Sequence, residues 1–149
     1  MRRHLQLRQS FETCRFDSES WAIELPIASS EVPILICEIT LLLFGRAAQL
    51  SLLFPLQKKV LLTVSAGSST VDGTDVQPIS LNLSRIHLEF VLGYLCTWYR
   101  DGVAEVNHID VELKGSEGAG SDCTLVVKAD QSQPPLSGEE AERILREMM

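Results

Sequence analysis

His87 is the residue of this chain whose position best suits a chemical role. It falls in the first turn of a predicted helix over 84–101, on the same side as Tyr94 and Trp98. A neutral imidazole beside a tyrosine hydroxyl could act as a base in a pocket. A histidine at the edge of an apolar face is more often a core residue bonded to a backbone carbonyl. His87 and Tyr94 are therefore candidate catalytic residues, whereas helical spacing excludes a dyad of His87 with Cys96.

A second polar group lies on a predicted strand over 106–114. His108, Asp110 and Glu112 are two residues apart, so their side chains point to one face of the strand and are neighbours. Imidazole and carboxylate groups at this spacing could bind a divalent metal ion. A polar strand face is more often the solvated side of a sheet. The sequence offers these three residues as candidate metal ligands and predicts no other metal site.

The other motifs that carry chemistry are absent from the sequence. Four cysteines occur, at positions 14, 37, 96 and 123, without a CxxC pair or a neighbouring histidine. Cys37 and Cys96 are expected to be small buried residues rather than zinc ligands or disulfide partners. Gly115, Gly118 and Gly120 precede a strand, whereas a phosphate cradle needs a helix N-terminus. The chain has no GxxxxGK[ST], HExxH or GxSxG motif, so no cofactor or cofactor-binding residue is predicted.

The candidate residues are positioned by elements predicted in the second half of the chain. Ser84 is a good N-cap, and Gly102 suits the left-handed residue that ends a helix. The apolar side of this helix is expected to fill the core with Ile86, Phe90, Val91, Tyr94, Leu95, Trp98 and Tyr99. A strand over 123–129 follows the glycine loop. A capping box then begins a last amphipathic helix over 137–149, expected to dock on a sheet edge.

The most apolar segment of the chain is Val32–Leu56. Its length would suit a membrane span, but Glu38 and Arg46 lie inside it, and each would cost roughly 3 kcal/mol at a bilayer centre. A buried helix over 31–48 followed by a strand over 50–56 is favoured instead. Two strands are the alternative, because short apolar runs do not distinguish the two structures.

The remainder of the first half is read from alternating apolar and polar residues. This pattern predicts a strand within 11–27 and another over 59–65. The basic residues 1–10 are expected to be a flexible tail, because no apolar signal-peptide core follows them. The chain is therefore expected to lack a secretory signal and to be cytoplasmic.

The predicted order of strand, helix, strand and strand occurs twice, over 21–65 and over 79–129. Identity between these segments is low, so internal repetition is a hypothesis. Halves that fail to superpose, or that occupy different sheets, would contradict it. The elements together predict one soluble α+β domain over 11–149, with a mixed or antiparallel sheet covered by two main helices and a helix added at the C-terminus.

Charge and composition exclude several classes of function. The chain has 149 residues with 45% hydrophobic side chains, which argues against disorder. Its 13 Lys and Arg against 20 Asp and Glu give a net charge of −7, whereas nucleic-acid binders are usually basic. Fourteen of the acidic residues follow residue 60, so a basic partner would be sought on the C-terminal half.

These observations favour a non-enzymatic interaction or accessory module with a protein partner or a second copy. The reason is that the apolar surface of the helix over 31–48 exceeds what one small sheet is expected to cover. The alternative is a small enzyme or ligand-binding protein with a pocket around His87, Tyr94 and Trp98. Loss of a ligand-induced thermal shift in His87→Ala would favour the alternative.

Overall fold

The structure, a computed structural model, describes residues 2–16, 20–73, 78–115, 122–130 and 138–148. The strands are β1 (Arg2–Gln6), β2 (Glu12–Arg15), β3 (Ser20–Ile27), β4 (Gln49–Leu53), β5 (Lys59–Ser65), β6 (Thr70–Asp72), β7 (Ile79–Ser84), β8 (His108–Gly115) and β9 (Asp122–Ala129). The helices are α1 (Val32–Leu43), α2 (Arg85–Asp101) and α3 (Gly138–Met148), with short 3-10 turns η1 (Ser29–Glu31) and η2 (Pro55–Gln57). Within these residues the strands form one mixed sheet, so the predicted α+β class is confirmed.

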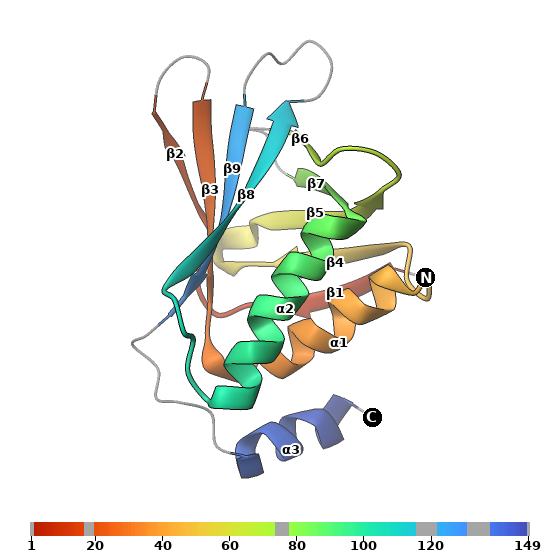
Figure 1. Cartoon of the computed structure of the whole chain (residues 1–149), viewed down its shortest axis with the longest axis vertical. Helices are drawn as coiled ribbons and strands as arrows, with labels where there is room; N and C mark the ends of the chain where they lie inside the picture. Colours follow the sequence, from red (N-terminus) through yellow and green to blue (C-terminus); the bar gives the residue numbers. More distant parts are fainter. Residues whose placement is uncertain (1, 17–19, 74–77, 116–121, 131–137, 149) are drawn as a thin grey trace.

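The sheet has the strand order β1-β4-β5-β7-β6-β8-β9-β3-β2. It consists of two parts that run in different directions, β1-β4-β5-β7-β6 and β8-β9-β3-β2 (Figure 1). Two residue pairs between β6 and β8 join the parts, Thr70 with Lys114 and Val71 with Gly115. Helices α1 and α2 pack together in the angle between the parts and cover one face (Figure 1). The opposite face of β8-β9-β3-β2 carries no helix among the described residues.

Each half of the chain contributes strands to both parts of the sheet. The first half has the order β2-β3-α1-β4-β5, and the second has the same order in β6-β7-α2-β8-β9. The hairpins β4-β5 and β8-β9 are antiparallel, as are the pairs β2-β3 and β6-β7. Two parallel pairs join the halves, β5 with β7 and β3 with β9. In each pair, one strand comes from the first half and the other from the second. The connections of the two halves thus correspond strand by strand, while the superposition of the halves stays a prediction.

Two predicted boundaries in the first half are wrong. The expected flexible tail over 1–10 contains β1, which pairs in parallel with β4, and its Leu5 and Leu7 are buried. The helix expected over 31–48 ends at Leu43, because Gly45 adopts φ +71°, which breaks the helical path. The apolar segment Val32–Leu56 thus contains a helix followed by a strand, as favoured, and the alternative of two strands is wrong.

Neighbouring helices cover both sides of α1. Helix α2 packs along one side and α3 along the other (Figure 1), so α3 rests mainly on α1 and η1 rather than on a sheet edge as predicted. Every residue of α1 is buried or half-buried as a result. The expectation that this helix presents excess apolar surface to a partner is therefore wrong for Val32–Leu43, whereas Phe44, just past the end of α1, is 73% exposed. No helix within the described residues is long and apolar enough to cross a bilayer.

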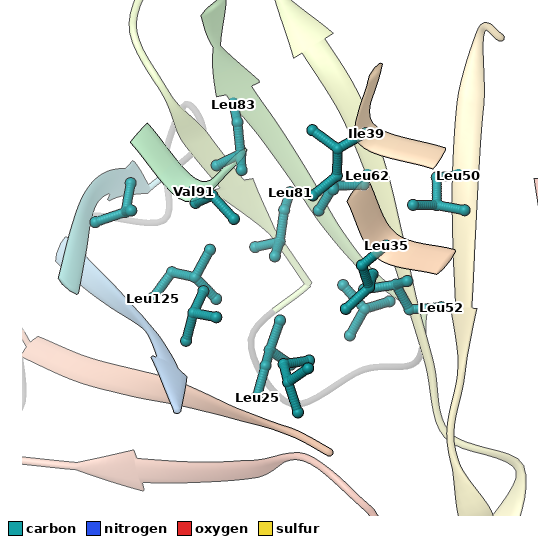
Figure 2. Close-up of a cluster of buried hydrophobic side chains, with 14 of the residues drawn as sticks. Leu25, Leu35, Ile39, Leu50, Leu52, Leu62, Leu81, Leu83, Val91 and Leu125 are labelled. Atoms are coloured by element: carbon teal, nitrogen blue, oxygen red, sulfur yellow. The ribbon is translucent and has the colours of Figure 1, made fainter. Parts of the chain in front are cut away.

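The core lies between the two helices and the two parts of the sheet. Figure 2 shows that aliphatic side chains from both halves of the chain converge there, among them Leu25 and Leu125 from β3 and β9 and Leu62 and Leu83 from β5 and β7. A cavity of about 30 Å³ remains at the centre and is lined by apolar side chains alone. A water molecule would find no hydrogen-bond partner in it, so the cavity is a dry packing gap.

Candidate functional site

His87 is part of a hydrogen-bonded cluster with two serines. Ser84 caps α2, since its Oγ accepts from the His87 backbone N–H at 3.2 Å. The Ser84 backbone N–H donates to Ser69 Oγ at 2.7 Å, and Ser69 Oγ lies 2.5 Å from His87 Nδ1. A hydroxyl beside an imidazole has the arrangement of a nucleophile and its base. Ser69 is only 3% exposed, however, so a substrate cannot reach it, and the cluster serves to join α2 to the segment before β6.

Tyr94 and Trp98 lie farther along α2 and have other partners. The Tyr94 hydroxyl donates to the Val106 carbonyl oxygen at 2.8 Å. Burial raises the pKa of Tyr94 above its ordinary value, which keeps this hydroxyl protonated as a donor. Trp98 is buried with its ring centroid 6.1 Å from that of Tyr94. The hollow that Tyr94 lines includes neither His87 nor Trp98.

The candidate metal ligands are exposed on the outer face of β8. His108 Nε2 lies 3.7 Å from Asp110 Oδ1, and both side chains are about half exposed. Glu112 instead accepts a hydrogen bond from the Thr124 hydroxyl of β9, at 3.1 Å to Oε1. His108, Asp110 and Glu112 all line an open hollow of about 380 Å³. Within the part of the chain that the structure describes, no group of three His, Cys, Asp or Glu residues could hold a metal ion.

The side of α2 that faces away from α1 is an uncovered apolar surface among the described residues, which also leave single apolar side chains such as Phe44 and Leu56 exposed elsewhere. Arg85 marks the side toward α1, since its Nη1 donates to the Leu43 carbonyl oxygen at 2.9 Å. Phe90 and Tyr94 lie on the opposite side by helical spacing. The exposed fractions are 76% for Ile86, 49% for Phe90 and 50% for Val106, which precedes β8. We call the group Ile86, Phe90, Gly93, Tyr94, Thr97 and Val106 the α2 flank.

The α2 flank corrects what periodicity predicted for this helix. Ile86 and Phe90 were expected in the core, but only one side of the apolar face packs there, with Leu88, Val91, Leu95 and Trp98. Tyr99 and Cys96 are likewise exposed rather than buried. The sequence feature that indicates the exposed side is the width of the apolar face of this helix, which is greater than the sheet beneath it covers.

A hollow of about 350 Å³ forms the centre of the α2 flank. Phe90, Val106 and Ile109 supply its apolar surface, and Tyr94 supplies its edge. Two carboxylates complete the lining, from Glu89 and Glu105, and no basic residue takes part. Glu89 also pairs with Arg85, at 3.1 Å. The hollow is therefore apolar at its base and acidic at its rim.

Sequence reasoning missed a buried carboxylate at the start of α1. Glu31 is 5% exposed and accepts backbone N–H bonds from Ala28 and from Arg8, each at 2.8 Å. Burial raises its pKa above the ordinary value despite these bonds. The carboxylate ties the segment after β1 to α1, a role that a Glu at a helix start does not reveal by itself.

Comparison of the chain with protein-family models, curated proteins and solved structures found no match in any of the three. The α2 flank is the feature of the described residues that best suits a function.

Proposed function

We propose that the protein is a non-enzymatic interaction module that binds a protein partner through the α2 flank. The observation that carries the proposal is that exposed Phe90 and Val106 line one hollow with Ile109 of β8, while exposed Ile86 lies one turn before Phe90 on α2. Large apolar side chains that gather around a hollow with a polar rim are typical of binding surfaces, whereas isolated exposed ones are not. The partner surface thus lies on the second helix rather than the first.

The alternative of an enzyme or ligand-binding protein has weaker support. His87 is engaged by a buried serine, and Tyr94, two turns farther along α2, donates to the carbonyl oxygen of Val106, which lies outside the helix. The central cavity of about 30 Å³ has no polar side chain in its lining to orient a ligand. The proposal includes the cytoplasmic location favoured by the sequence, where the exposed thiols of Cys14 and Cys96 would stay reduced.

The proposal is tested by site-specific photo-crosslinking in cells that produce the chain. The photoreactive residue p-benzoylphenylalanine replaces Phe90 in one variant and Leu56 in another. Leu56 is 86% exposed but lies in η2, outside the α2 flank, and serves as the matched control. A discrete adduct is expected from position 90 and not from position 56.

A further substitution shows whether the adduct depends on the surface. Val106→Glu adds a charge to the hollow and is expected to abolish the adduct from position 90. Circular dichroism checks that the fold is unchanged. The absence of any adduct at position 90, or equal adducts at both positions, would contradict the proposal.

A further inference from the structure

We infer that the partner segment is an amphipathic α-helix with basic residues beside its apolar stripe. This inference rests on the proposed function and names the partner of the same surface. Three observations carry it: the correspondence of the two halves, the shape of the hollow and the charge of its rim.

The first observation is that this chain already contains a helix on the corresponding surface of its other half. Helices α1 and α2 occupy corresponding places in the two halves, each between a parallel-paired strand and a hairpin. The side of α1 away from α2 is covered by α3, whose Ile144 is 9% exposed. The side of α2 away from α1 has no such cover among the described residues. We take the packing of α3 on α1 as the precedent for a helix at this position.

The second observation is that the α2 flank admits close approach of a helix. Ile86, Phe90, Gly93 and Thr97 follow one another at the three- and four-residue spacing of a helical ridge. Gly93 leaves open space above the helix surface, with no atom within 4 Å of where a Cβ would lie. Phe90 and Val106 both line the hollow and would contact an apolar side chain that enters it. Helices that pack this way approach to about 8–10 Å between axes.

The third observation is charge, which distinguishes an outside partner from a second copy. The rim of the hollow carries Glu105 and Glu89, of which Glu89 also pairs with Arg85. The described exposed residues of α3 include Glu139, Glu142 and Glu147 against Arg143 and Arg146, so α3 of a second copy would bring more carboxylates to an acidic rim. Lysine or arginine on the partner helix would instead meet opposite charge.

The inference is tested with synthetic peptides added to the full chain and followed by fluorescence anisotropy. One peptide is an amphipathic helix with an Ile-Leu stripe and lysines beside it. A second has glutamates in place of the lysines, a third is residues 137–149 of this chain, and a fourth is an extended peptide of alternating Val and Lys. The lysine helix is expected to bind best, and 0.5 M salt is expected to weaken it.

Three variants locate the binding site. Phe90→Glu and Ile86→Glu are expected to weaken the lysine helix about tenfold or more, while Leu56→Glu leaves its affinity unchanged. Ile86 is exposed enough that its substitution preserves the fold even where Phe90→Glu does not. Equal binding of the glutamate helix, or tighter binding of residues 137–149 or of the extended peptide, would overturn the inference. If no peptide binds while the crosslink at position 90 forms, the helical partner is wrong and the interaction module stands.

Discussion

Helices α1 and α2 correspond in the two halves, yet their outer sides differ. The twelve residues of α1 include one charged side chain, and α3 together with α2 leaves none of them exposed. Helix α2 has charged residues at both ends and presents Ile86 and Phe90 to solvent. The difference shows that the apolar content of a helix does not indicate whether its outer side is covered in this fold. The more apolar helix is the structural one, and the more polar helix has the open apolar surface.

The largest expected effect concerns the cover on α1. Ile144→Ala removes most of a buried side chain where α3 packs on α1 and is expected to lower the free energy of unfolding by about 2 kcal/mol. Ile86→Ala on the α2 flank is expected to change it by less than about 0.5 kcal/mol, because Ile86 is 76% exposed. Urea unfolding of both variants measures the contrast. Equal losses of unfolding free energy in the two variants would mean that the outer sides of α1 and α2 are covered alike.

The starts of the two helices are expected to respond differently to pH. The raised pKa of Glu31 means that the folded state holds this proton more tightly than the unfolded chain does, so this contribution to stability falls as the pH rises from 4.5 through the folded pKa. Glu31→Gln removes that contribution, and its unfolding free energy is expected to depend less on pH above 4.5 than that of the wild type. Urea unfolding at pH 5 and pH 7 measures the change.

Ser84→Ala is the matched comparison at α2. It removes a neutral cap and is expected to cost about 1 kcal/mol at both pH values. The loss of unfolding free energy in Ser84→Ala could instead differ between pH 5 and pH 7 by as much as it does in Glu31→Gln. That result would show that the two helix starts respond to pH alike.

The smallest expected effect concerns the edge of the hollow. Tyr94→Phe removes the hydrogen bond from the hydroxyl to the Val106 carbonyl and is expected to cost about 0.5 kcal/mol. Hydrogen exchange is expected to rise at residues 103–107, which this bond holds against α2. Protection that stays as in the wild type would show that Val106 keeps its place on the α2 flank without Tyr94.

Sequence reasoning succeeded where a local signal decides the structure. The bounds of β5 are as predicted, and α2 begins after Ser84 and ends at Gly102 because the cap and the left-handed glycine act on their own residues. Strand β1 was missed because its alternation is short and its polar residues are basic, which is also the composition of a tail. Its pairing with β4 comes from a segment more than forty residues away.

The candidate site was harder to predict, for a related reason. Periodicity indicates which side of a helix is apolar, but it does not say how much of that side another element will cover. Phe90 and Leu95 both satisfy the pattern, and only the packing of the sheet and α1 makes one exposed and the other buried. The hydrogen bond between Ser69 and His87 likewise depends on the antiparallel pairing of β6 with β7. Both strands lie between these two residues in the sequence, and their pairing brings the residues together.

The exchange of strands between the halves has a consequence for synthesis on the ribosome. Strand β3 pairs with β9, and Ser20 faces Asp122 across that pair. At elongation rates of about 5–20 residues per second, roughly 5 to 20 s separate the synthesis of the two strands. During that interval β3 has only β2 beside it, and an apolar edge is open to wrong pairing. The nascent chain is therefore most in need of chaperone protection between the completion of β3 and the emergence of β9.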